Sequence, residues 1–189
     1  SLLAVQENCL LAINSGESDV VIGKLLDHYY EINAGIGVHK SPELYGAFPT
    51  DAYSHTPATK GAQQPGMTGQ VKEDILSRIG ELGVFVENGK ITFKPKLLKT
   101  SEFLDSSETF EYITVNNEKK TLKVDKNHLC FTYCQVPVIY KIADTNNIEV
   151  VYNNSKTEQV IGLVLSDTVS TEIFNRTNKV SHLIVSIIK

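Results

Sequence analysis

The sequence predicts a mixed α+β protein in which helices precede strands. Apolar residues recur at helical spacing in two separate parts of residues 2–82, whereas from residue 84 onward short runs of β-branched and aromatic residues alternate with polar turns. Between the helical parts, residues 34–66 hold four of the six prolines and five glycines and show no sustained period. We expect two domains: 1–82, with terminal helices and an ordered polar loop, and 83–189, with the strands.

The first helical part predicts an antiparallel helical hairpin. Residues 2–14 place five apolar residues near one helical face: Leu2, Val5, Cys9, Leu10 and Ile13. After a break at 14–16, Ser18 or Ser15 is the expected cap of a second helix. Its stripe contains Val20, Val21, Leu25, Leu26 and Tyr29, of which Tyr29 is expected in the core. Both stripes need a partner, and we favour chain beyond this sequence over the following domain.

The second helical part, residues 68–82, predicts one further helix. Thr68 is its expected cap, and Gly83 suits a left-handed end. Asp74 and Arg78 stand at the spacing of an ion pair. The apolar face is formed by Val71, Ile75, Ile79 and Leu82.

The remaining chain predicts an antiparallel β-sandwich that opens with a hairpin. Asn88-Gly89 is the pair that a type I′ turn favours, and it sets Glu87 opposite Lys90. A short helix with Ser170 or Thr168 as cap is expected before the last strand. The further strands are expected at 110–115, 120–124, 128–134, 137–143, 148–153, 159–165 and 182–188.

The charge and the apolar pattern of the sequence argue against two classes of partner, nucleic acid and membrane. The net charge of −4 gives no basic field for nucleic acid, and no apolar run approaches the roughly 20 residues of a membrane helix. Cys130 and Cys134 lie four residues apart in a predicted strand, about 13 Å, too far for a disulfide. We therefore expect reduced cysteines, no nucleic acid and no membrane, while the compartment stays open.

The sequence contains no complete motif for binding a nucleotide or a zinc ion. The glycine-rich run at 61–70 follows no strand and lacks the Gly-Lys-Ser/Thr ending of a phosphate loop. The five histidines are too far apart in sequence for a zinc pattern. We expect neither cofactor nor metal.

The candidate substrate-binding residues lie in the polar loop: Asp51, Tyr53, His55, Gln63 and Gln64. Amides and carboxylates suit sugar hydroxyls, and tyrosine offers a ring to the apolar face of a pyranose. Each also has a structural alternative, because such side chains equally tie down a long loop. Glu73 borders the loop, but its place in the first turn of a helix favours a structural role over catalysis.

The order of these parts resembles the C-terminal portion of an (α/α)-barrel glycoside hydrolase or phosphorylase of the six-hairpin type. The amino-acid sequence itself is similar to that of the family over residues 61–104. In this range "SRIGELGV" ends a helix and "NGKITFKPKLLKTSEF" begins the β-rich tail. The resemblance implies the last helices of a helical toroid, with the loop at 51–70 near the rim of a sugar-binding cleft. None of the family's catalytic acids is matched here, so the catalytic residues stay unknown and this chain alone should be inactive.

Two other classes of protein are alternatives to a glycoside hydrolase or phosphorylase. A non-catalytic β-sandwich module that binds carbohydrate or another partner fits the β-rich half, and an assembly domain fits if the helical stripes pair between two copies. The only methionine is Met67, so we expect the chain to belong to a longer polypeptide whose upstream part is a partner.

Overall fold

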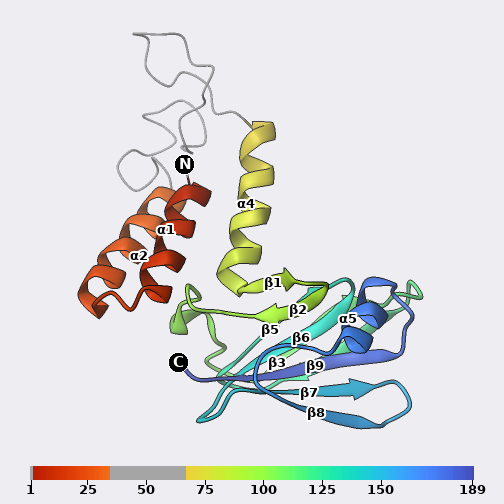
Figure 1. Ribbon diagram of the computed structural model, residues 1–189. Coiled ribbons are helices and arrows are strands. Elements are labelled where there is room, and N and C mark those ends of the chain that lie inside the picture. The colour runs from red at the N-terminus through yellow and green to blue at the C-terminus, as the bar shows by residue number, and fades with distance from the viewer. Residues whose placement is uncertain (1, 35–66) are drawn as a thin grey trace. The chain divides into compact units, whose positions relative to one another are not determined.

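The computed structural model describes residues 2–34 and 67–189, which form two compact units. Ser1–Glu81 is here called the helical unit, and Leu82–Lys189 the C-terminal unit. The predicted α+β class is confirmed: the described residues form the helices α1, α2, α4 and α5 and nine strands (Figure 1).

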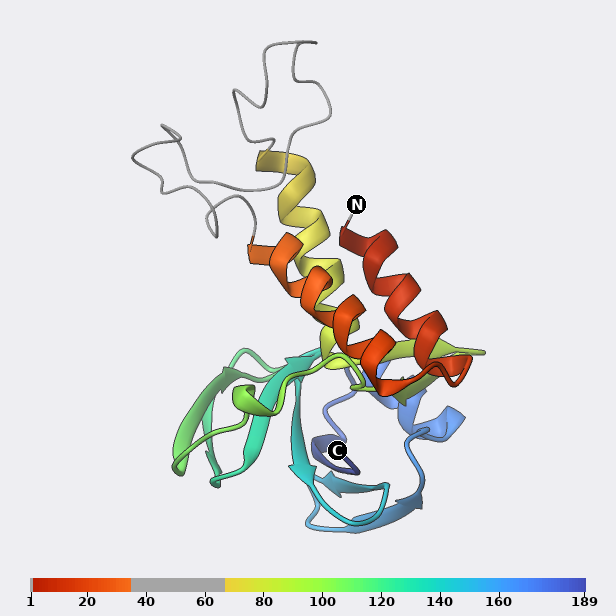
Figure 2. The same cartoon turned by 90° about the vertical axis from the view of Figure 1, so that its left-hand side faces the viewer.

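The helical unit contains α1 (Leu2–Asn14), α2 (Asp19–Ala34) and α4 (Met67–Leu82). The predicted hairpin of α1 and α2 is confirmed, and the two helices lie side by side in both views (Figures 1 and 2). Ser18 is the cap of α2, because its hydroxyl accepts a hydrogen bond from the N–H of Val21 at 3.4 Å.

The predicted apolar stripes of the helical unit are only partly buried. Leu2, Cys9 and Tyr29 are buried, as expected. In contrast, Val20 is 68% and Ile75 is 56% exposed, so the described residues leave the predicted stripes of α2 and α4 uncovered at these positions. A buried polar cluster, described below, occupies the contact between the helices instead.

The prediction for the start of α4 was wrong, and the prediction for its end is confirmed. The helix already begins at Met67, so Thr68 lies inside its first turn and is not the cap. At the other end, Gly83 directly follows the last helical residue with φ +69°, the left-handed conformation that was expected.

The C-terminal unit begins with the predicted hairpin of β1 (Val84–Glu87) and β2 (Lys90–Phe93). Asn88 and Gly89 have φ values of 51° and 78°, as a type I′ turn requires, and Glu87 stands opposite Lys90. The carboxylate of Glu87 nevertheless pairs with Lys94, at 2.5 Å.

The other strands form one hairpin and one larger sheet. A 3₁₀ turn, Thr100–Glu102, precedes the hairpin of β3 (Glu108–Ile113) and β4 (Lys119–Val124). The larger sheet has the order β5-β6-β9-β7-β8. Its strands are β5 (His128–Tyr133), β6 (Val136–Ile142), β7 (Asn147–Tyr152), β8 (Thr157–Ile161) and β9 (Val180–Ile187).

The larger sheet is mixed, which corrects the expectation of a purely antiparallel tail. All its neighbours are antiparallel except β6 and β9, which run parallel. The last strand enters between β6 and β7 after α5 (Asp167–Phe174), which lies against β2 and β9 (Figure 1). This insertion brings the end of β7 beside the start of β9, where Tyr152 stands opposite Val180.

The caps of α5 were predicted wrongly. Ser166 caps the helix, because its hydroxyl accepts a hydrogen bond from the N–H of Val169 at 3.3 Å. Ser170 is buried in the helix, where its hydroxyl accepts the N–H of Ile91 in β2 at 3.1 Å.

The three cysteines are free, as expected. Cys134 was wrongly placed in a strand, since β5 ends at Tyr133. Cys134 and Gln135 form the turn to β6 with φ values of 48° and 66°, both in the left-handed region that non-glycine residues seldom adopt.

Candidate functional site: a polar pocket of the C-terminal unit

The residues that the sequence put forward as substrate contacts, Asp51, Tyr53, His55, Gln63 and Gln64, lie outside the described residues. Of the acids at the border of the loop, Glu73 is described. Its carboxylate accepts a hydrogen bond from the backbone N–H of Leu3 at 3.3 Å. It thus serves one of the free N–H groups at the start of α1, a structural role.

A hollow lies where the β7–β8 turn meets the loop before β9. We call it the wide hollow; it measures about 550 Å³, within the usual range of ligand pockets. Its lining consists of Tyr152, Asn153, Asn154, Lys156, Asn178 and Lys179.

Turn chemistry shapes one wall of the wide hollow. The N–H of Tyr152 donates to the carbonyl of Lys156 at 2.9 Å, which closes the turn. Ser155 adopts a left-handed φ of 65°, and the side-chain oxygen of Asn154 accepts the N–H of Lys156 at 3.1 Å. The asparagine side chain therefore fixes the local backbone, as asparagine often does in turns.

Asn153 joins the two walls. Its backbone N–H donates to the carbonyl of Lys179 at 2.9 Å, and its side-chain amide donates to the carbonyl of Asn178 at 2.6 Å. The same amide also contacts the side-chain oxygen of Asn178 at 3.2 Å. Both amide contacts use the nitrogen, and no group in residues 2–34 and 67–189 donates to the side-chain oxygen of Asn153, so this oxygen is an acceptor open to a ligand.

A second, narrow hollow adjoins the wide one. It measures about 10 Å³, room for a group the size of one water molecule, and shares Asn153 and Asn178 with the wide hollow. Gln135 contributes to it and donates from its side chain to the carbonyl of Thr114 at 3.2 Å. The remaining lining residues are Tyr112, Val115, Lys120, Val180 and Ser181.

Two acids, Glu172 and Glu158, form hydrogen bonds to residues that line the wide hollow. Glu172 accepts hydrogen bonds from Lys179, at 2.6 Å, and from Thr177, and these contacts lower the pKa of the carboxyl group. Glu158 accepts the hydroxyl of Tyr152 at 2.7 Å. Partial burial, together with this hydrogen bond, raises the pKa of Tyr152 to about 12, so the phenol is neutral at physiological pH.

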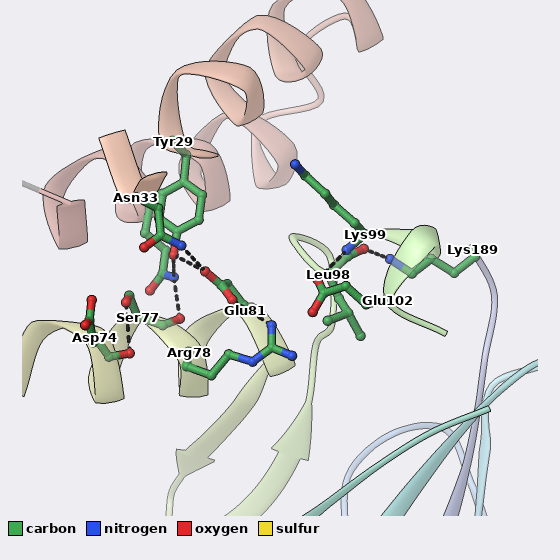
Figure 3. A network of polar contacts seen from close by, with 11 residues as sticks. Tyr29, Asn33, Asp74, Ser77, Arg78, Glu81, Leu98, Lys99, Glu102 and Lys189 are labelled. Carbon is green, nitrogen blue, oxygen red and sulfur yellow. Dashed lines mark hydrogen bonds and ion pairs between the residues drawn. The ribbon is translucent and has the colours of Figure 1, made fainter. Parts of the chain in front are cut away.

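The helical unit contains a buried polar cluster of a different kind. Tyr29 donates to Glu81 at 2.7 Å, Asn33 donates to it at 3.1 Å, and Arg78 pairs with its other oxygen at 2.7 Å. Figure 3 shows Tyr29 and Asn33 pointing from α2 toward Glu81 on α4. Glu81 is only 4% exposed, and both of its oxygens are already bonded. We interpret the cluster as structural.

Gln6 extends this cluster to α1. Its side-chain amide donates to the hydroxyl of Tyr29 at 3.1 Å and to the carbonyl of Ser77 at 2.9 Å. The close approach depends on Gly80, because a Cβ there would lie 2.1 Å from the side-chain oxygen of Gln6. Three helices thus meet around hydrogen bonds rather than an apolar seam.

Other site chemistries are missing from the described residues. No group of three or more His, Cys, Asp or Glu side chains in residues 2–34 and 67–189 is placed to hold a metal ion. Within the same ranges, no helix is both long and apolar enough to cross a membrane.

Two asparagines are a weak signal for the hollow in the sequence. Asn153 lies in the "NNSK" turn between two predicted strands, and Asn178 lies just before the last predicted strand. Such turns become a site only if they meet, and that depends on the pairing of β7 with β9.

Comparison with known proteins adds no family. No family model matches the chain, and no curated protein sequence matches it either.

Proposed function

We propose that the chain is part of a carbohydrate-active protein and that its C-terminal unit binds carbohydrate without catalysis. The observation that carries this proposal is the wide hollow, whose lining residues include one tyrosine, Tyr152, and three asparagines. Sugars present hydroxyl groups, which need donors and acceptors, and apolar C–H faces, which favour an aromatic ring. The lining supplies both kinds of contact.

The absence of acids in the lining supports binding over catalysis at this place. Glycosidic bond cleavage requires a pair of carboxyl groups on either side of the bond. Among the described residues, neither hollow has an aspartate or a glutamate in its lining.

The second candidate is the C-terminal portion of an (α/α)-barrel glycoside hydrolase or phosphorylase. The order of helices, Asn-Gly hairpin and β-rich tail favours it. So do the exposed Val20, Ile75 and Leu76, which further helices of the same polypeptide would cover. In this case Asp51, Tyr53, His55, Gln63 and Gln64 stay candidate substrate contacts. Alternatively, a second copy of the chain covers these exposed apolar residues. Sedimentation equilibrium distinguishes such a dimer from a monomer.

Binding of the 189-residue chain to a panel of oligosaccharides tests the first candidate. We expect Tyr152→Ala to weaken binding by about tenfold, because it removes the ring, and Tyr152→Phe to retain most of the affinity. Tyr152 is half-buried at a strand end, so circular dichroism checks that both variants are folded. No binding by the unmodified chain would overturn the proposal.

Turnover tests the second candidate. Glycans and aryl glycosides are offered, with and without phosphate, to the complete natural protein and to this chain. Activity of the complete protein alone supports the barrel enzyme. Inactivity of both, with binding retained, leaves the binding function alone.

A further inference from the structure

We infer that the carbohydrate bound at the wide hollow carries a negative charge, as a carboxylate, sulfate or phosphate group. The inference rests on the proposed carbohydrate-binding function and adds the class of ligand. It starts from the charged side chains that line the two hollows.

The lining of both hollows contains positive side chains and no negative ones. Lys156 and Lys179 line the wide hollow, and Lys120 lines the narrow one. The whole chain has a net charge of −4, with 22 acidic against 18 basic residues. A lining with three lysines and no acid is therefore not what the composition alone would give.

Two of these lysines already have acidic partners. Lys179 pairs with Glu172 at 2.6 Å, and Lys120 pairs with Glu118 at 3.6 Å. The side chains of Lys179 and Lys120 are 64% and 50% exposed, so water and salt weaken both ion pairs. An anionic ligand can compete for both ammonium groups.

Lys156 is the uncompensated charge. Its ammonium group has no acidic partner within the part of the chain that the structure describes. Its backbone, in contrast, is held by the side chain of Asn154 and by the N–H of Tyr152. The turn thus fixes the backbone of Lys156, which lines the same hollow as Tyr152.

The neutral groups of the lining complete the recognition of a charged sugar. Asn153 offers an acceptor oxygen and Tyr152 a neutral ring, so both suit the uncharged part of the ligand. The positive charge alone would accept any anion, whereas the combination selects an anion on a sugar.

Matched ligands test the inference. The unmodified chain is titrated calorimetrically with an oligogalacturonate and its methyl ester, with a sulfated oligosaccharide and its desulfated form, and with a sugar phosphate and the free sugar. We expect the charged member of at least one pair to bind about fivefold or more tightly than its neutral partner, less so at 0.5 M salt. Which pair responds identifies the anionic group.

Substitutions locate the effect. Lys156→Gln should reduce the preference for the charged member about fivefold, because only the charged member gains from the ammonium group, and circular dichroism checks that the exposed substitution leaves the chain folded. Lys126→Gln, at an exposed lysine between β4 and β5, is the control and should leave the preference unchanged.

The contrary outcomes are distinct. Equal binding of both members of every pair would overturn the inference and leave carbohydrate binding intact. Binding of inorganic phosphate or sulfate as tight as that of the charged sugars would also overturn it, because the sugar then contributes nothing. No binding of any carbohydrate would overturn the proposed function as well.

Discussion

Gly83 connects the last residue of a helix to a strand under two separate constraints. Its φ of +69° is left-handed, and a Cβ would lie 2.2 Å from the backbone carbon of Lys94. Lys94 also donates its N–H to the carbonyl of Gly83 at 2.6 Å. Backbone atoms cannot move aside as the end of a side chain can, so only glycine fits here.

We therefore expect Gly83→Ala to lower the free energy of unfolding by about 3 kcal/mol, through the left-handed conformation and the clash together. Gly162→Ala is the matched control: its φ is +83°, but nothing lies within 4 Å of the added Cβ. It should cost only about 1 kcal/mol. Urea denaturation measures both, and equal losses would contradict the role given to the clash.

At the scale of elements, the contact between α1 and α4 depends on Gly80 and Gln6. An alanine at Gly80 would displace the amide of Gln6 and break its buried hydrogen bonds to Tyr29 and Ser77. Such losses cost about 1–3 kcal/mol, more than the roughly 1 kcal/mol that alanine gains over glycine in a helix.

Gly80→Ala should thus destabilise the chain, while Gly23→Ala, in α2 with nothing within 4 Å, should stabilise it by up to about 1 kcal/mol. In a Gln6→Ala background the penalty at Gly80 should disappear, which a double-mutant cycle measures. Stabilisation by both alanines in the original background would show that Gln6 does not hold the helices together.

Turns and helix ends with a local sequence signal were predictable, but which strands lie side by side was not. Asn88-Gly89 and Gly83 predicted a turn and a helix end because the required left-handed conformation is a local property. The parallel pairing of β6 with β9 was missed because strand patterns do not encode which strand lies beside which. The wide hollow was missed for the same reason, since Asn153 and Asn178 meet only through the pairing of β7 with β9.

The prediction of which helical residues are buried was limited in a similar way. Periodicity placed Ile75 on an apolar face that is exposed at this position, and it gave no reason to bury Gln6 or Glu81. Buried polar residues need specific partners, here Tyr29 and Arg78, and those partners come from other helices or other turns.

At the scale of the whole molecule, buried thiols and phenols predict a loss of stability in alkali. Burial raises the pKa of Cys130 from 9.0 to about 12, and it raises the pKa of Tyr140 strongly from 10.0. The unfolded chain loses these protons first as the pH rises. The stabilisation is therefore complete below pH 9 and is lost between pH 9 and 12.

Each proton that only the unfolded chain has lost lowers the free energy of unfolding by about 1.4 kcal/mol per pH unit. Urea midpoints at pH 7, 9, 10 and 11 should fall from pH 9 upward, and Cys130→Ala should make the first part of the fall less steep. A midpoint that stays constant to pH 11 would contradict the burial of these groups.

The central claim is that carbohydrate binds where the β7–β8 turn meets the loop before β9. The most direct test is a ¹H–¹⁵N spectrum of the 189-residue chain during titration with an oligosaccharide that it binds. The account predicts that the side-chain amides of Asn153, Asn154 and Asn178 shift, together with the backbone amides of Lys156 and Lys179. Shifts confined to other parts of the chain, with these five residues unchanged, would contradict it.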